Sequence, residues 1–229
     1  MTLYETIFTR RSVRSYENGA MPDSELRALR DFIDGTNRLE GAAGRFEVVG
    51  RDAVRAMAPH YALAYCDGSD AELANVGFVL ENADLYLQSR GFGSLFLGMQ
   101  KPVGGAGQGF EIMLAFGKTS VPARAGEGDF DRLPVGEVSG QDNAVARAAR
   151  LAPSAMNSQP WRFEFGEGRV SIMYKGRGLK KLILRRLNKI DLGIAARCAE
   201  LALLDEGRSV TAVRAVNEGK ELGVRIEFS

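Results

Sequence analysis

The stretch that decides the fold of this chain reads Pro153-Ser154-Ala155-Met156-Asn157-Ser158-Gln159-Pro160-Trp161-Arg162-Phe163. An alanine-rich segment (144–152) precedes it and an apolar segment follows it, so the sequence predicts a loop between a helix and a strand. Four polar side chains share the loop, two prolines stiffen it, and Pro160 favours extended backbone at Gln159. Such a loop can present hydrogen-bonding groups to a polar heterocycle. The alternative is a polar loop that merely leads into a strand, with Trp161 in the core.

A basic cluster near the N-terminus forms a second motif, in which Arg10, Arg11 and Arg14 flank Ser12. Guanidinium groups and a hydroxyl bind phosphate well, because arginine offers forked, charge-assisted donors. Clusters of surface arginines are also common, so the motif taken alone favours a solvated face. It becomes informative in combination with the loop at residues 153–160.

The chain also repeats itself. The segments Gly77–Leu87 and Gly193–Leu203 both read as buried helices, and each is followed by a glycine, Gly91 and Gly207, suited to a left-handed helix cap. One offset of 116 residues relates both pairs (193 − 77 and 207 − 91). The pattern indicates a tandem duplication, although two unrelated halves can share an order of helices and strands. Shorter matches in the same order link Arg45-Phe46-Glu47 with Arg162-Phe163-Glu164, Ala64-Tyr65 with Met173-Tyr174, and 111–116 with 223–228.

Hydrophobic periodicity and breaker residues give a coarse map of the elements. Helices and strands mix without a regular strand–helix–strand alternation, which predicts an α+β fold. We expect a first half at residues 1–120, a linker rich in glycine and proline at 121–141, and a second half at 142–229, intertwined as one domain. The expected helices cover 3–9, 22–33, 71–90, 142–152, 179–188 and 190–205, and the expected strands cover 45–50, 60–66, 110–116, 161–165, 169–174, 209–216 and 222–228.

Together the two motifs resemble those of the FMN-dependent nitroreductase-fold family. The resemblance lies in the run Arg10-Arg11-Ser12-Val13-Arg14-Ser15-Tyr16 after a short helix and in residues 152–163, of which the second is the more specific. The segment Gly91–Gly98 is similar to the glycine-rich segment that follows the long central helix of this family. The similarity extends to the strand that ends at Phe116-Gly117-Lys118, so scattered anchors touch most of the chain.

The resemblance implies FMN as the cofactor and assigns residues to its phosphate and ring. Arg10 and Ser12, with Arg11 beside them, are expected to hold the phosphate, and Arg124 is a candidate for a further phosphate cation. Arg14 is expected to face the pyrimidine edge of the ring, where a cation stabilises the negative charge of the reduced flavin.

The resemblance also implies contacts from the opposite side of the ring. Pro153, Ser154 and Asn157 are expected to contact the ring or the ribityl chain. The backbone amides near Gly98 and Met99 are candidates for contact with flavin N5. No side chain is expected to act as acid or base, because the cofactor supplies the chemistry.

The sequence departs from the usual family pattern, in which both motifs lie close together and two subunits share each flavin. Here the first half keeps Arg10–Arg14 but reads Asp34–Gly41 where its loop is expected. The second half keeps the loop but reads Gly126–Arg132, an acidic stretch unsuited to phosphate, where its arginine motif is expected. The surviving parts are complementary. The chain therefore resembles the branch in which two subunits have fused, which implies an internal pseudo-dimer, monomeric as such, with one FMN in a cleft between the halves.

The implied activity is hydride transfer from NADH or NADPH through FMN to an electron-poor acceptor such as a nitroaromatic or a quinone. A module that binds FMN without turnover is the first alternative. The second depends on the stretch Lys175–Lys189, which holds seven basic residues on an amphipathic pattern and could contact a membrane surface or nucleic acid. A core-packed helix with a solvated face is favoured there. We also expect Gln159 to brace its loop and His60 to be structural.

Composition sets further limits on function. The chain has 229 residues, of which 45% are apolar and 26% charged, as is typical of a globular protein. Thirty basic against 29 acidic residues leave a net charge of +1, which gives no overall electrostatic case for nucleic acid or membrane partners. Cys66 and Cys198 do not suggest a disulfide framework, and we find no metal-ligand spacing. We therefore expect a cytoplasmic protein that acts on small molecules.

Overall fold

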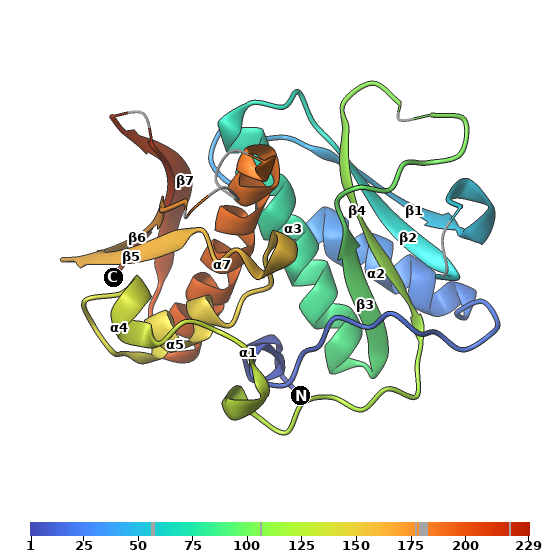
Figure 1. Ribbon diagram of the computed structural model, residues 1–229, viewed down its shortest axis with the longest axis horizontal. Coiled ribbons are helices and arrows are strands. Elements are labelled where there is room, and N and C mark those ends of the chain that lie inside the picture. The colour runs from blue at the N-terminus through green and yellow to red at the C-terminus, as the bar shows by residue number, and fades with distance from the viewer. Residues whose placement is uncertain (56–57, 106, 177, 179–182, 220) are drawn as a thin grey trace.

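Two four-stranded antiparallel sheets flank a central pair of long helices (Figure 1). The computed structural model describes the whole chain apart from residues 56–57, 106, 177, 179–182 and 220. The strand order is β1-β2-β4-β3 in the first sheet and β5-β6-β8-β7 in the second, so both sheets have the same topology along the chain. The strands are β1 (Arg45–Gly50), β2 (His60–Tyr65), β3 (Phe92–Leu97), β4 (Phe110–Lys118), β5 (Trp161–Gly166), β6 (Arg169–Tyr174), β7 (Val210–Glu218) and β8 (Glu221–Phe228).

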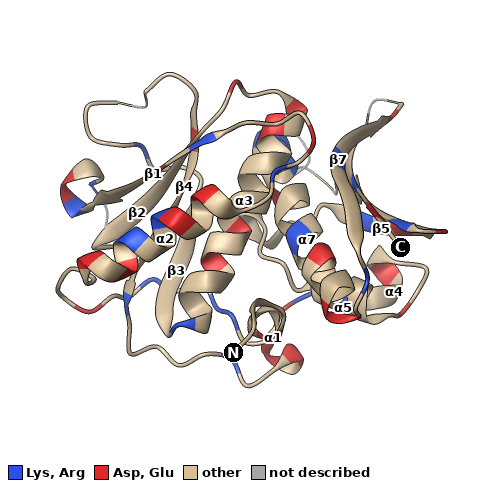
Figure 2. Ribbon diagram, turned by 180° about the vertical axis from the view of Figure 1, so that it is seen from behind, with Lys and Arg blue, Asp and Glu red and all other residues tan. Residues whose placement is uncertain are grey.

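The helices fill the space between and around the sheets. Helix α2 lies against the first sheet and buries Leu26, Leu29 and Ile33, which share one face at helical spacing. Figure 2 shows acidic and basic residues interspersed along the same helix on its outer side. Helix α5 packs against α7. The helices are α1 (Leu3–Ile7), α2 (Asp23–Gly35), α3 (Asp70–Ser89), α4 (Val135–Val138), α5 (Ala144–Arg150) and α7 (Arg185–Asp205).

Helices α3 and α7 cross at two glycines. A Cβ atom at Gly77 would collide with the carbonyl oxygen of Ile190, and one at Gly193 would collide with the carbonyl oxygen of Ala74. The two contacts are reciprocal, because the offset of 116 residues relates Ala74 to Ile190 as it relates Gly77 to Gly193 (190 − 74 and 193 − 77). The absence of a side chain at both positions lets the two backbones touch. The crossing fixes the two sheets relative to each other.

Both long helices end as the sequence predicts. Gly91 follows α3 with φ of 84°, and Gly207 follows α7 with φ of 76°, so each lies in the left-handed region that favours glycine. At the other end of α3, the side chain of Ser69 accepts a hydrogen bond from the Glu72 N–H and caps the helix. These local signals explain why the boundaries of α3 follow the pattern of the sequence.

The core joins both halves of the chain. Trp161 is fully buried, which confirms its predicted place in the core, and it packs in the same cluster as residues of α3 and α7. His60 is also buried, and its Nε2 accepts a hydrogen bond of 2.9 Å from the Met21 N–H, which confirms a structural role. None of the described helices combines the length and the hydropathy that a membrane span requires.

Two predictions about elements are wrong. Strand β3 is absent from the predicted map, because Gly93 weakens the strand pattern; the strand forms by pairing with β4. The predicted break at residues 189–190 does not exist, because α7 runs through it from Arg185. Within the segment predicted as a linker, Val135–Val138 form the short helix α4. Residues 179–182 of the predicted basic helix lie outside the described residues. Further along, Arg186 pairs with Glu111 and Lys189 pairs with Asp70.

Candidate functional site

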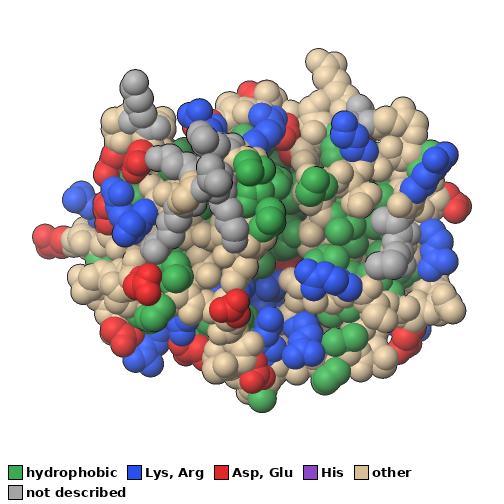
Figure 3. Space-filling model, viewed as in Figure 1, with side chains coloured by type: hydrophobic (Ala, Val, Ile, Leu, Met, Phe, Trp, Pro, Cys, Tyr) green, Lys and Arg blue, Asp and Glu red, His purple; other side chains and the backbone are tan. Residues whose placement is uncertain are grey.

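One cavity brings together side chains from both halves of the sequence. The cavity has a volume of about 160 Å³, or about 600 Å³ when the open space at its mouth is included. Figure 3 shows hydrophobic side chains around a depression near the middle of this face, with Lys and Arg side chains along its lower edge. The residues that line the cavity are Ser12, Arg14, Leu95, Phe96, Gly98, Ile112, Pro153, Ser154, Ala155, Met156, Leu187, Asp191 and Ile194.

The N-terminal motif reaches the cavity along the edge of the first sheet. Ser12 forms a parallel bridge with Ser94 of β3, and the Val13 N–H donates to the carbonyl oxygen of Ser94 at 2.8 Å. This pairing carries Ser12 and Arg14 along β3 towards Gly98, which follows the strand. The Arg14 guanidinium forms no ion pair with any residue in the described part of the chain.

The second motif is a loop with unusual backbone geometry. Met156, Asn157 and Gln159 have φ angles of 50°, 51° and 45°, in the left-handed region that non-glycine residues rarely adopt. Each such residue costs on the order of 1–3 kcal/mol and persists only where surrounding contacts impose it. Strain of this kind concentrates at functional sites, which supports a binding role for the loop.

Gln159 supplies two of the contacts that impose this geometry. Its N–H donates to Ser154 Oγ at 2.9 Å, and its Oε1 accepts from the Leu133 N–H at 2.8 Å. The predicted bracing role of Gln159 is therefore confirmed. The prediction of extended backbone at this residue is wrong, because the hydrogen bond to Ser154 outweighs the bias from the following proline.

Asn157 does not line the cavity. Its Nδ2 donates to the carbonyl oxygen of Asp131 at 3.0 Å, and its Oδ1 accepts from Arg132 Nη1 at 2.9 Å. Arg132 also donates to the carbonyl oxygens of Leu151 and Ala152. The acidic segment Gly126–Arg132 thus contributes Arg132, which holds the loop through hydrogen bonds. The sequence pattern did not predict this role.

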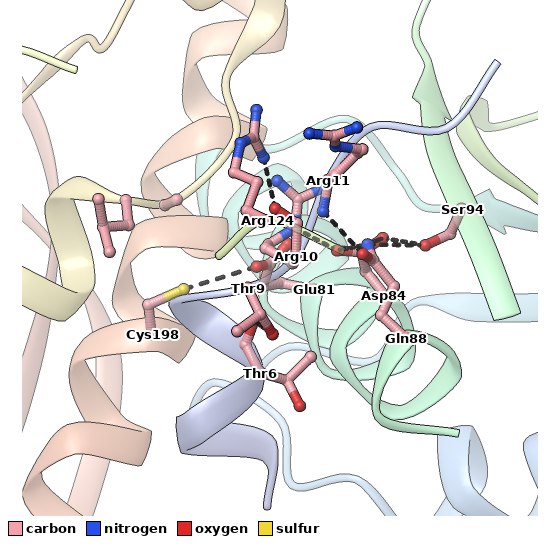
Figure 4. A network of polar contacts seen from close by, with 12 residues as sticks. Thr6, Thr9, Arg10, Arg11, Glu81, Asp84, Gln88, Ser94, Arg124 and Cys198 are labelled. Atoms are coloured by element: carbon pink, nitrogen blue, oxygen red, sulfur yellow. Dashed lines mark hydrogen bonds and ion pairs between the residues drawn. The ribbon is translucent and has the colours of Figure 1, made fainter. Parts of the chain in front are cut away.

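Arg10 is buried, 2% exposed, and does not line the cavity. Figure 4 shows it among the buried polar side chains of α3. Its Nε donates to Asp84 Oδ2 at 2.7 Å, and Asp84 also accepts from Gln88 and Ser94. The Arg11 N–H donates to Gln88 Oε1 at 2.8 Å, which ties the motif to the same group. The resemblance predicts that Arg10 contacts the phosphate. In the structure its Nε is paired with the buried Asp84, and the side chain supports the motif from within the core.

A second carboxyl group lies beside the Arg10–Asp84 pair. Burial, together with the nearby Asp84 charge, raises the pKa of Glu81 well above its usual range. Cys198 donates a weak hydrogen bond to Glu81 Oε1 at 3.5 Å, and burial also raises the pKa of this thiol. One buried arginine therefore lies between two carboxyl groups and pairs with Asp84, and burial disfavours the charged form of Glu81.

Arg124 lies close to Arg10 and Arg11, and Arg132 lies close to Arg10 and Arg124, so the four arginines form one positive cluster. Burial and the charges of Arg10 and Arg11 lower the pKa of Arg124. Burial and the charges of Arg10 and Arg124 lower the pKa of Arg132 to about 10. In Figure 4 the guanidinium groups of Arg11 and Arg124 point away from the buried carboxyl groups. Neither forms an ion pair with a carboxylate among the described residues. Arg124 donates to the carbonyl oxygens of Arg10 and Asp129, which are uncharged, so the cluster keeps its positive charge and is suited to an anion.

The structure thus divides the ten predicted site residues into two sets. The neighbours Gly98 and Met99 fall into different sets. Gly98 faces α7, because a Cβ atom at this position would lie 2.9 Å from Leu187 Cδ2. Met99 is 91% exposed. The five that line the cavity are Ser12, Arg14, Gly98, Pro153 and Ser154. The five that lie outside its wall are Arg10, Arg11, Met99, Arg124 and Asn157.

Sequence reasoning missed Asp191, which lines the cavity from α7 and is 3% exposed. Its two carboxyl oxygens lie 3.1 and 3.2 Å from the Ala155 nitrogen, whose N–H donates to them. Burial raises the pKa of Asp191 well above its usual range, and the hydrogen bond from Ala155 only partly offsets this effect. An aspartate inside an apolar helical stretch was the signal that could have identified it, because buried carboxyl groups need a partner.

Comparisons with known proteins agree with this fold. A family model described as "Putative TM nitroreductase" matches residues 2–203. The crystal structure of a putative nitroreductase from Thermotoga maritima has the same fold, with a TM-score of 0.71 at 20% identity, covering 99% of this chain and 94% of that chain.

Weaker similarities extend to other solved structures. A nitroreductase family protein from Clostridium difficile matches 62% of this chain and 99% of its own at 16% identity and a TM-score of 0.49. A putative nitroreductase in complex with FMN from Desulfovibrio desulfuricans matches 62% and 96% at 17% identity and a TM-score of 0.45. No curated protein matches the chain. From the match over residues 2–203, the chain belongs to the Putative TM nitroreductase family.

Proposed function

We propose that this protein is an FMN-dependent oxidoreductase that passes hydride from NADH or NADPH to an electron-poor small molecule, such as a nitroaromatic or a quinone. One observation carries the proposal: Ser12, Arg14 and Gly98 from one half of the chain line the same cavity as Pro153 and Ser154 from the other. Membership of the nitroreductase family supports the same class of reaction.

We infer that the chain is an internal pseudo-dimer of two tandem halves, residues 1–120 and 142–229, joined by a linker at 121–141. The identical strand orders of the two sheets and the reciprocal glycine contacts of α3 and α7 support this view. In a symmetric dimer a residue i of one subunit meets j of the other and j meets i. The pairs Gly77–Ile190 and Gly193–Ala74 follow the same rule within one chain.

The residues that line the cavity, together with the arginine cluster beside Ser12, fit FMN. Ser12, Arg11 and Arg124 offer a hydroxyl and two cations for the phosphate, and the repulsion among the arginines is relieved by a bound anion. Arg14 offers a cation for the pyrimidine edge of the ring, and Pro153 offers an apolar wall. We assign Arg10 to the support of this motif, because its ion pair with Asp84 anchors the segment from below.

When bound, FMN would supply the hydride chemistry, and the chain would supply position and electrostatics. The Arg14 guanidinium would stabilise negative charge that develops at the pyrimidine edge. Leu95, Phe96 and Ile112 would exclude water from the ring and strengthen that interaction, because charges interact more strongly in a medium of low dielectric constant. The rigid loop at 153–159 would hold the opposite wall in place.

We infer one FMN per chain, because the equivalent loop of the first half is closed by side chains. Asn37 Oδ1 accepts from Arg197 Nη1 at 3.1 Å, and Asn37 Nδ2 donates to Glu200 Oε1 at 2.8 Å. Arg197 Nε also donates to Asn82 Oδ1 at 2.9 Å, and Glu200 is 2% exposed. Asn37 corresponds to Pro153 at the offset of 116 (153 − 37), so this buried network fills the position that lines the cavity in the second half.

Stepwise reduction under anaerobic conditions tests the proposed activity. NADH or NADPH should bleach the flavin absorbance of the purified protein, and a quinone or a nitroaromatic should restore it. Arg14→Ala should slow the bleaching, because it removes the cation that stabilises reduced flavin. A flavin that neither reductant bleaches would overturn the enzymatic proposal and would leave a module that binds FMN without turnover.

A further inference from the structure

Asp191 connects the cavity loop to the rigid centre of the molecule. It belongs to α7, two residues before the glycine at which α7 touches α3, and it accepts the Ala155 N–H at 3.1 and 3.2 Å. One turn earlier, Asn188 Oδ1 accepts a hydrogen bond of 2.9 Å from Ser158 Oγ. Two side chains of one helix therefore hold the two ends of the strained segment.

The first half of the chain contains the same arrangement. Asn75 of α3 accepts the Leu39 N–H at 3.2 Å, and both residues lie at the offset of 116 from the contact in the second half (191 − 75 and 155 − 39). Glu72, one turn earlier in α3, accepts the Ala43 N–H at 2.6 Å and corresponds in position to Asn188 (188 − 72). The same two helix positions thus anchor the loop of each half.

The two loops differ in what the anchoring achieves. The three residues Met156, Asn157 and Gln159 of the second loop take left-handed backbone angles, whereas no such non-glycine residue lies at 34–43, a stretch that the structure describes completely. Left-handed residues persist only where other contacts hold them. The Ala155 N–H lies directly before them, at the start of the turn 155–157. Its hydrogen bond to α7 is therefore placed to fix the direction of the loop.

We propose that Asp191 is a positioning residue of the cofactor site: by accepting the Ala155 N–H, it holds residues 153–157 against the cavity so that Pro153 and Ser154 form its wall. This inference rests on the proposed function. The acceptor oxygen carries the role, since an amide performs the same task at Asn75. The loop is thereby positioned relative to the crossing of α3 and α7 and to the opposite wall at Ser12 and Arg14.

Titration of flavin-free protein with FMN, followed by quenching of flavin fluorescence, tests the inference. Asp191→Ala should weaken FMN binding about tenfold to hundredfold, because a lost hydrogen bond of ordinary strength leaves the loop free to relax. Asp191→Asn keeps the acceptor oxygen, so its dissociation constant for FMN should lie within about threefold of that of the unaltered protein. Its circular dichroism signal in the flavin bands should also match that of the unaltered protein.

Asn75→Ala is the matched control, because it removes the equivalent contact from the half whose loop is closed. It should lower the melting temperature as Asp191→Ala does, yet leave FMN affinity within about threefold. If Asp191→Ala does not fold, Ala155→Pro removes the same N–H from the loop side. Ser154, at φ −146° and ψ 156°, already has the backbone that precedes a proline.

Each outcome decides the matter. Unchanged FMN affinity in Asp191→Ala or Ala155→Pro would overturn the inference, as would equal weakening in Asn75→Ala, which would indicate general destabilisation. Equal weakening in Asp191→Asn would overturn the role of the acceptor oxygen. Unaltered protein that binds no FMN would instead overturn the proposed function, and this inference with it.

Discussion

The loops at residues 34–43 and 153–159 occupy equivalent places in the two halves, yet only the second lines the candidate site. Both are anchored by side chains of their own long helix. The first loop sends Asn37 into a buried network with Arg197 and Glu200, whereas the second is shaped by prolines and left-handed residues. The contrast shows that shared anchoring sets where a loop lies, and that its side chains decide whether a cavity remains.

A similar contrast separates the arginines in and beside the N-terminal motif. Arg10 is buried in an ion pair with Asp84, whereas Arg11 and Arg124 point away from those carboxyl groups. One guanidinium group thus supports the site, and the other two form no ion pair with a described carboxylate that would compete with an anion. Sequence adjacency alone does not distinguish these roles.

The largest expected effect comes from breaking the buried pair. Arg10→Ala leaves Asp84 buried without its cation, which should lower the free energy of unfolding by about 3–5 kcal/mol. Arg11→Ala, in contrast, should change stability by less than about 0.5 kcal/mol while it weakens FMN binding. Urea unfolding of both variants measures the difference. Equal stability of the two would contradict the division between support and binding.

The helix crossing should be sensitive at both glycines. Gly77→Ala and Gly193→Ala each place a methyl group against a backbone carbonyl of the other helix, which should cost about 2–3 kcal/mol as the helices separate. Gly136→Ala in α4 is the control, because no atom lies within 4 Å of its added Cβ, and it should be neutral or slightly stabilising. A large effect at one crossing glycine and none at the other would refute a symmetric crossing.

The smallest expected effect is a pH dependence of stability that arises from the carboxyl group of Asp191 and that an amide, such as the one at the equivalent Asn75, does not have. Burial raises the pKa of Asp191 in the folded protein. The contribution of this carboxyl group to stability is therefore fully present below its pKa in the unfolded chain, about 4. The contribution is lost as the pH rises through the pKa in the folded protein. Asp191→Asn carries no such proton and should gain stability relative to the unaltered protein as the pH rises. Melting temperatures at a series of pH values measure this gain. A difference that stays constant with pH would show that the Asp191 carboxyl is not held protonated.

Local patterns in the sequence were sufficient for much of the fold. The caps at Gly91 and Gly207 and the apolar face of α2 depend on neighbours within a few residues, and they were predictable for that reason. Strand β3 was not predictable, because Gly93 and Ser94 interrupt its strand pattern and its pairing partner is β4.

The site shows the same limit. The patterns at 10–14 and 153–160 identified four residues that line the cavity, and the segment 91–98 identified a fifth, Gly98. They could not assign Arg10 to Asp84, which lies 74 positions away. The hydrogen bond of Asn157 to Asp131 and the anchoring by Asp191 also depend on contacts between residues far apart in the sequence. Roles set by a distant partner could not be predicted from residue type and spacing alone.

The measurement that tests the central claim most directly is the flavin content of the purified protein, from its absorbance spectrum and the mass of the released ligand. A single pocket between the two halves predicts a yellow protein with about one FMN per chain. A colourless protein that takes up no added FMN, or one that binds two FMN per chain, would contradict it.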